Sequence, residues 1–218
     1  MKRVILLAGH YGSGKTNIAV SLAFRMKEQY ENVAVADLDI VNPYFRTKDS
    51  KDAFEKAGIR FIGSAYANTN LDVPALPQEL YAVTDDKTLH AVMDVGGDDR
   101  GALALGRYAP ALKEENDYEM LLVVNGYRPL TRTAAEVEEV RREIEQAGGL
   151  PFTGLVNNSN LGKETTAEDV LRSVTFAEEA AALTKLPILF TSVDERLFPA
   201  LDGKIPHLFP LKLQQHPF

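Results

Sequence analysis

The chain contains no cysteine and no tryptophan, and it has no excess of basic residues. Without cysteine there are no structural disulfides, thiolate nucleophiles or cysteine-ligated clusters, so any metal must use oxygen or imidazole ligands. The chain has 24 Lys and Arg against 31 Asp and Glu, a formal net charge of −7 and a pI near 5.2. This acidic balance argues against nucleic acid as the main partner.

The sequence also lacks any apolar run of membrane-spanning length, and we expect no membrane partner. It starts with MKRVILLAGHYG, whose apolar run is shorter than the core of a signal peptide, so we expect a cytoplasmic protein. At 218 residues, 45% of them hydrophobic, the chain is long enough for one sizeable core. We therefore expect a single domain over residues 1–218.

Short apolar runs alternate with helical patterns along the chain. Strands are predicted near residues 3–8, 33–37, 60–62, 91–94, 120–125, 152–157 and 187–191. Thr133 with Glu136, and Thr166 with Asp169, have the spacing of helix capping boxes, and the second helix is expected to end near Thr184. This alternation predicts an α/β fold with a mostly parallel, twisted sheet and helices on both faces. Ligands of such sheets bind at the carboxyl ends of the strands.

Residues 9–16 read GHYGSGKT and match the GxxxxGK[S/T] pattern of a phosphate-binding loop. Its glycines let the backbone approach phosphates, while Lys15 is expected to reach the β- and γ-phosphates and Thr16 to ligate Mg²⁺. A glycine-rich turn that binds nothing is the alternative, but a strand-like run and a helical pattern flank the motif. We expect the nucleotide to contact Gly9, His10, Tyr11, Gly12, Ser13, Gly14, Lys15, Thr16 and Asn17.

Carboxylates follow two of the predicted strands. Asp94 opens the segment DVGGD, where a Walker B aspartate would organise Mg²⁺, and Gly97 frees the backbone to approach a γ-phosphate. In the segment DLDIVNPYFRT we expect Asp39 to face the nucleotide, whereas Asp37 could equally be a solvated residue at the strand end. The predicted metal ligands are Thr16, Asp39 and Asp94, and the predicted catalytic residues are Lys15, Asp39 and Asp94.

Taken in order, GHYGSGKT, DLDIVNPYF, DVGGD and NNSN make the chain resemble the MinD/ParA/CobQ-type ATP-binding superfamily, in the SIMIBI class of P-loop NTPases. The resemblance covers nearly the whole chain, although only the first motif is specific. It implies that Asp39 orients the attacking water, that Asn157 contacts the adenine and that the region around Asp194 closes the base pocket. A nucleotide-dependent homodimer also follows from the resemblance alone.

The chain departs from this resemblance at one position. Relatives with the deviant form of the loop carry a lysine directly after the first glycine, which reaches the partner's phosphates across a dimer, and here that residue is His10. A neutral imidazole has no fixed charge. Arg46 could supply the charge as an arginine finger, or it could be an exposed loop residue. Arg100 and Arg128 could contact phosphates or a partner, or could cap nearby helices.

The base is predicted from a motif that is missing. Guanine-specific P-loop proteins use an N/TKxD motif, whereas the corresponding strand end here reads NNSN at residues 157–160. We therefore expect ATP rather than GTP. Asn157 can pair with adenine through both of its amide groups, although asparagines after a strand commonly form turns.

Two function classes remain open, both of which use ATP and Mg²⁺. We favour a regulatory or assembly ATPase that acts on a partner protein and converts ATP to ADP slowly without it. The other class is a small-molecule kinase or an ATP-dependent ligase of the dethiobiotin synthetase or CobQ kind, which needs an acceptor pocket that the sequence does not reveal. A pure nucleotide-binding module is disfavoured by the intact set of Lys15, Thr16, Asp39 and Asp94.

Residues 63–90 lack a sustained periodicity and lie just before the strand that ends at Asp94. An irregular stretch of this length could carry a substrate or partner site. It could equally be an ordered excursion with a short helix near residues 78–83.

Overall fold

The computed structural model describes residues 1–38, 48–63, 78–97 and 99–212. Asp39 and Arg46, and most of the irregular segment before His90, lie outside these residues. The predictions made for them are therefore carried forward as predictions.

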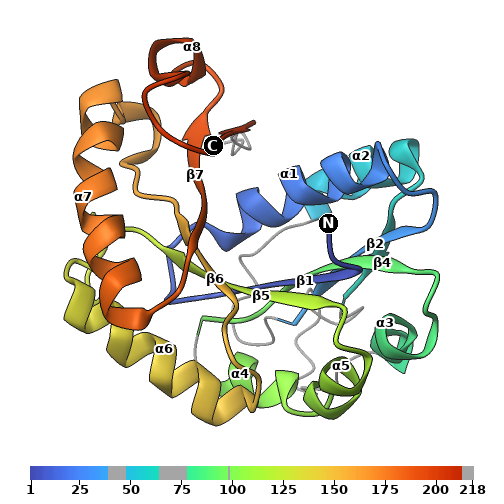
Figure 1. Ribbon diagram of the computed structural model, residues 1–218. Helices are drawn as coiled ribbons and strands as arrows, with labels where there is room; N and C mark the ends of the chain where they lie inside the picture. Colours follow the sequence, from blue (N-terminus) through green and yellow to red (C-terminus); the bar gives the residue numbers. More distant parts are fainter. Residues whose placement is uncertain (39–47, 64–77, 98, 213–218) are drawn as a thin grey trace, which may run out of the picture.

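The described residues form one sheet of eight strands in the order β3-β2-β4-β1-β5-β6-β7-β8 (Figure 1). The strands are β1 (Val4–Ala8), β2 (Val33–Asp37), β3 (Arg60–Ile62), β4 (His90–Asp94), β5 (Tyr118–Val124), β6 (Gly154–Asn157), β7 (Ile188–Asp194) and β8 (Leu208–Leu211). Every neighbouring pair is parallel. The predicted parallel α/β fold is confirmed, and β1 to β7 lie where the apolar runs predicted strands.

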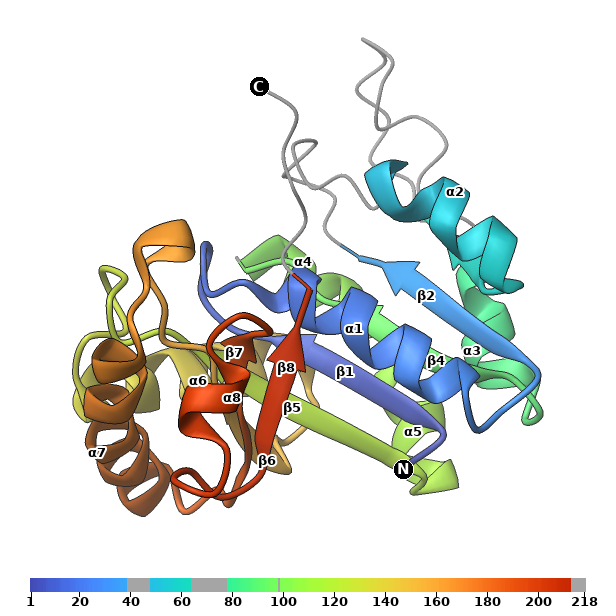
Figure 2. The same ribbon diagram turned by 90° about the horizontal axis from the view of Figure 1, so that it is seen from above.

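Helices cover both faces of the sheet (Figure 2). One face carries α1 (Lys15–Lys27) and α2 (Lys48–Ala57). The other carries α3 (Ala82–Asp85), α4 (Asp99–Leu105), α5 (Ala109–Glu115), α6 (Ala134–Gly148) and α7 (Ala167–Thr184). A short α8 (Phe198–Leu201) packs beside β8, and single 3₁₀ turns occur at η1 (Gln78–Tyr81) and η2 (Gly162–Glu164). Among the described helices, none is both long and apolar enough to cross a bilayer.

The central strand β1 feeds two hydrophobic cores because its side chains alternate between the faces. Val4, Leu6 and Ala8 join the core under α4 to α7, whereas Ile5 and Leu7 join the core under α1. All five are buried, as expected for a parallel strand covered on both sides. This burial fixes where β1 ends, and therefore where the phosphate-binding loop begins.

The helix caps read from the sequence are confirmed. The Thr133 hydroxyl accepts a hydrogen bond from the Glu136 amide while the Glu136 carboxylate accepts one from the Thr133 amide, and Thr166 and Asp169 repeat this arrangement. Gly149 closes α6 in the left-handed conformation, with φ 65°. Each cap contributes about 1 kcal/mol to its helix.

Strand β8 was missing from the predicted set. It is four residues long and contains Pro210, which has no N–H to donate to a ladder. Within the described sheet β8 lies at the edge and pairs with β7 alone. A proline is tolerated in such an edge strand, because its missing N–H need not remove a hydrogen bond to the neighbouring strand.

Candidate functional site

The loop between β1 and α1 needs its glycines for conformation and for space. Gly12 and Gly14 have φ values of 79° and 84°, in the left-handed region that other residues rarely adopt. A Cβ added to Gly9 would lie 2.3 Å from the carbonyl oxygen of Val123, the residue beside it on β5. The backbone of this loop is therefore fixed against the neighbouring strand.

Lys15 is buried and folds back over this loop. Its Nζ donates to the carbonyl oxygen of Gly9 at 2.9 Å and to that of His10 at 3.3 Å. The Ser13 hydroxyl is also buried, and it has no hydrogen-bond partner within the described part of the chain. A lysine ammonium and a buried hydroxyl thus belong to the same loop, and both can donate to phosphate oxygens.

Thr16 and Asp94, which were predicted as metal ligands, lie together. The Thr16 hydroxyl donates to the Asp94 carboxylate at 2.8 Å, and the Asp94 side chain is 3% exposed. A hydroxyl and one carboxylate fit Mg²⁺, which usually takes few protein ligands and keeps several waters. Among the described residues no group of three acidic or histidine side chains gathers, so such a metal would also need phosphate or water oxygens. Asp39, the third predicted ligand, lies outside the described residues.

The segment after β4 also contacts the phosphate-binding loop. A Cβ added to Gly97 would lie 2.7 Å from the Tyr11 amide nitrogen and 3.0 Å from the Gly9 carbonyl oxygen. His10 is half-buried, with its Nδ1 3.1 Å from the Tyr11 carbonyl oxygen, while the Tyr11 side chain is 66% exposed. Asn17 lies half-buried in the first turn of α1. The predicted residues of the loop, Asp94 and Gly97 are therefore brought together at the carboxyl edge of the sheet.

Asn158 was not predicted as a site residue, yet its side chain is hydrogen-bonded to the phosphate-binding loop. Its Nδ2 donates to the Ser13 carbonyl oxygen at 2.6 Å, and its Oδ1 accepts from the Ser192 hydroxyl at 2.6 Å. A Cβ added to Gly14 would lie 2.3 Å from the same Nδ2. Asn158 thus ties the phosphate-binding loop to the ends of β6 and β7. The signal was present in the NNSN motif, in which consecutive residues leave the strand in opposite directions.

Asn157, which the resemblance placed at the adenine, faces α7 instead of this loop. It is fully buried, its Nδ2 donates to the Ser173 hydroxyl at 2.9 Å, and its Oδ1 accepts from the Ser159 amide at 3.2 Å. In the sheet order β6 lies two strands from β1. The amide already has partners inside the protein, and its contact with adenine stays a prediction.

Asp194 ends β7 and is engaged by a nearby arginine. Its carboxylate accepts from the Arg196 amide at 3.0 Å and from Arg196 Nε at 2.9 Å. The Arg196 guanidinium also donates to the carbonyl oxygens of Lys163 and Thr165. These bonds fix the segment after β6 against the end of β7, where the resemblance placed the base pocket. The role of Asp194 in that pocket is untested by this geometry.

The model of the CobQ/CobB/MinD/ParA nucleotide binding domain family matches residues 4–171, well over half of the chain. The chain belongs to this family. The match runs from β1 through the phosphate-binding loop and Asp94 into α7, so residues 4–171 contain a P-loop nucleotide-binding domain. No curated protein matches the chain in sequence.

Similar solved structures share the fold at low sequence identity. The signal recognition particle receptor FtsY from Elizabethkingia anophelis is 19% identical, with a TM-score of 0.53, over 88% of this chain and 59% of that one. FtsY from Mycoplasma mycoides is 15% identical, with a TM-score of 0.58, over 89% and 62%. The signal recognition particle 54 kDa protein from Aeropyrum pernix K1, in complex with GDP, is 18% identical, with a TM-score of 0.52, over 86% and 40%. This chain therefore spans less than two thirds of each.

Proposed function

We propose that the protein is a Mg²⁺-dependent ATPase that acts as a nucleotide-driven switch on a partner protein. The observation that carries the proposal is the 2.8 Å hydrogen bond between Thr16 and Asp94, beside a loop that also holds Lys15. Phosphate chemistry needs a fixed cation, a metal site and backbone donors in one place, and the closeness of these residues supports the proposal. Membership of the MinD/ParA-type family supports the nucleotide as ligand.

In this proposal each residue has a defined part in the attack of water on the γ-phosphate. Lys15 stabilises charge that develops on the phosphate oxygens, and Asp39 positions the water. Thr16 and Asp94 hold Mg²⁺, which neutralises further charge on the phosphates when it is bound. Gly97 follows Asp94 and packs so close to the Tyr11 backbone that a Cβ would clash there. We therefore expect loss of the γ-phosphate to change the conformation of the segment after β4.

The choice of ATP rests on the missing N/TKxD motif and needs a direct comparison with GTP. One of the similar structures is of a signal recognition particle protein bound to GDP, which makes guanine the competing base. In this chain the corresponding amides of Asn157 and Asn158 both form hydrogen bonds inside the protein. Calorimetric titration with ATP and GTP in parallel would decide between the two.

Among the residues that the structure describes, no observation favours the small-molecule kinase or ligase. A cavity of about 460 Å³ lies between α1, β5, β7 and β8, with Ile5, Leu121, Phe190 and Phe209 in its wall. Ile5 is four residues before Gly9, which corresponds to about 13 Å along a strand. Transfer requires the reacting atoms to be within about 3.5 Å, so an acceptor in this cavity would not reach the terminal phosphate.

Hydrolysis assays with two variants would test the proposal. Lys15→Ala should abolish nucleotide binding or turnover, whereas Asp39→Ala should leave binding intact and remove hydrolysis. Size-exclusion light scattering in ATP and in ADP would show whether a nucleotide-dependent homodimer forms. Unchanged hydrolysis in both variants would contradict the proposed roles of Lys15 and Asp39. A protein that stays monomeric in both ATP and ADP would favour the small-molecule enzyme.

A further inference from the structure

Arg128 lies against the phosphate-binding loop from the side of β5. A Cβ added to Gly12 would lie 3.8 Å from Arg128 Nε and 3.9 Å from its Cδ. The side chain is exposed, and within the described part of the chain its guanidinium has no carboxylate or carbonyl partner. By contrast, Arg141 and Arg196 each pair with a carboxylate within 3 Å. The Arg128 guanidinium is therefore available to bind an anionic ligand at the loop.

The turn that carries Arg128 is anchored by Asn125, which is 1% exposed. The Asn125 carbonyl accepts from the Arg128 amide at 3.0 Å and from the Thr131 hydroxyl at 2.8 Å. Its side-chain Oδ1 accepts from the Tyr127 amide at 3.0 Å and from the Asn160 amide at 3.3 Å. The side chain and the backbone carbonyl of the buried Asn125 thus fix the backbone on both sides of Arg128.

A second set of contacts fixes the same turn from the side of α7. The Gly126 amide donates to the Ser159 hydroxyl at 2.9 Å, and the Tyr127 hydroxyl donates to the Asp169 carbonyl at 2.8 Å. Two residues after Arg128, Leu130 has a φ of 65° and is 57% exposed. A leucine in the left-handed region is strained, and such strain persists where the surrounding structure requires it. The turn is held in one conformation that places Arg128 beside Gly12.

We propose that Arg128 binds the terminal phosphate of the nucleoside triphosphate held by its own chain. The inference rests on the proposed nucleotide site. The backbone at the start of α1 serves the inner phosphates, whereas Gly12 lies earlier in the loop, toward the end of the phosphate chain. Residues 9–14 have no side chain with a fixed positive charge. A guanidinium at Gly12 supplies that charge and can donate two parallel hydrogen bonds to phosphate oxygens.

The test compares triphosphate with diphosphate affinity in matched variants. Arg128→Ala removes the cation, Arg128→Lys keeps the charge without the fork, and Arg132→Ala removes an exposed arginine from the same segment. We expect Arg128→Ala to weaken MgATP binding about tenfold to a hundredfold, the loss of hydrogen bonds to a charged group. MgADP binding should change much less, Arg128→Lys should restore part of the loss, and Arg132→Ala should match the wild type.

Calorimetry at protein concentrations where light scattering shows a monomer, and at higher concentrations where it shows any dimer, separates the outcomes. GTP and GDP replace ATP and ADP if the wild type binds guanine better. An Arg128→Ala variant with the wild-type ratio of triphosphate to diphosphate affinity would overturn the inference and leave the proposed function standing. A loss confined to concentrations at which a dimer forms would overturn binding within one chain. A wild-type protein that binds neither nucleotide would overturn both proposals.

Discussion

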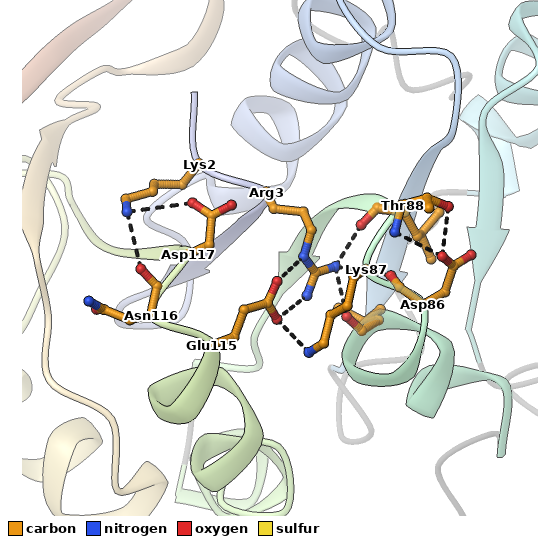
Figure 3. A network of polar contacts seen from close by, with 10 residues as sticks. Lys2, Arg3, Asp86, Lys87, Thr88, Glu115, Asn116 and Asp117 are labelled. Carbon is orange, nitrogen blue, oxygen red and sulfur yellow. Dashed lines mark hydrogen bonds and ion pairs between the residues drawn. The ribbon is translucent and has the colours of Figure 1, made fainter.

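The two ends of the parallel sheet use their polar side chains in different ways. At the amino end, the Arg3 guanidinium and the Glu115 carboxylate form a bidentate ion pair, and Lys87 adds a second contact to the same carboxylate (Figure 3). At the carboxyl end, Lys15 and Arg128 lie at a loop of backbone donors. At the amino end, the charged groups are paired with one another inside the protein, so we expect them to stabilise the fold. At the carboxyl end, we expect the cationic side chains of Lys15 and Arg128 to be available to a bound phosphate.

The Arg3–Glu115 pair at the centre of this network is largely buried, with side chains 4% and 14% exposed, whereas Lys87 at its edge is exposed. Arg3 is 4% exposed and donates to the carbonyl oxygens of Val83 at 3.0 Å and of Leu89 at 2.7 Å, besides its pair with Glu115. It therefore joins the start of β1 to the segment before β4 and to the end of α5. The neighbouring pair of Lys2 and Asp117, at 3.5 Å, is exposed and contributes little.

The largest expected effect comes from breaking the amino-end network. Arg3→Ala leaves the Glu115 carboxylate without its main partner and should lower the free energy of unfolding by about 3 to 5 kcal/mol. Urea denaturation would measure this loss, with Lys2→Ala as a control that should change it by less than about 0.5 kcal/mol. Nucleotide affinity of the folded Arg3→Ala protein should be unchanged. Equal stability of the two variants would contradict this account of the network.

The converse variant, Lys15→Ala, should affect the ligand and spare the fold. We expect nucleotide affinity to fall by about 3 kcal/mol, or more than a hundredfold, because the phosphate loses a charged donor. The free energy of unfolding should fall less than in Arg3→Ala, since the described acceptors of Lys15 Nζ are the neutral carbonyl oxygens of Gly9 and His10. Calorimetry and urea denaturation of the same samples would check both quantities. An unchanged affinity would remove Lys15 from the site.

Asn158 also lies at the carboxyl end of the sheet, but its described hydrogen bonds join it to Ser13 and Ser192 inside the protein. Asn158→Ala should cost about 1 to 3 kcal/mol of stability, since the Ser13 carbonyl and the Ser192 hydroxyl lose a partner. It should also weaken nucleotide binding, because the loop is held by that bond. Asn157→Ala is the matched variant, and its effect on ATP affinity tests the predicted adenine contact. Wild-type affinity in Asn158→Ala would show that the loop does not depend on this amide.

The smallest effect concerns pH at the amino end. The hydrogen bond from Arg3, with a further one from Lys87, lowers the pKa of Glu115 below its ordinary value of 4.5. The stabilisation is therefore complete above pH 4.5 and is lost as the pH falls toward the pKa in the folded protein. Glu115→Gln should be less stable than the wild type at neutral pH and should lose less stability on acidification. Identical slopes of unfolding free energy against pH would contradict the assignment.

Local patterns explain which features could be predicted from the sequence. The capping box at Thr133 depends on residues three positions apart, and the GHYGSGKT loop depends on eight consecutive residues. Strands β1 to β7 are apolar runs whose burial follows from their composition. Strand β8 was not predicted, because a proline in a four-residue run argues against a strand unless the run is known to lie at a sheet edge.

Long-range contacts explain what could not be predicted. Arg3 and Glu115 are 112 positions apart, and nothing in either neighbourhood indicates the other. The choice between Asn157 and Asn158 depends on which face each residue takes at the end of β6, a choice that one register step reverses. The approach of Arg128 to Gly12 depends on a turn fixed by Asn125, so the sequence left its role open.

Calorimetric titration of the wild type and of Lys15→Ala with ATP, with and without Mg²⁺, most directly tests whether the carboxyl edge is a nucleotide site. We expect ATP binding by the wild type to strengthen with Mg²⁺, because we propose that the adjacent side chains of Thr16 and Asp94 hold the metal beside the phosphates. We expect the Lys15→Ala heat signal to disappear. Absence of binding by the wild type, or equal binding by both proteins, would contradict this proposal.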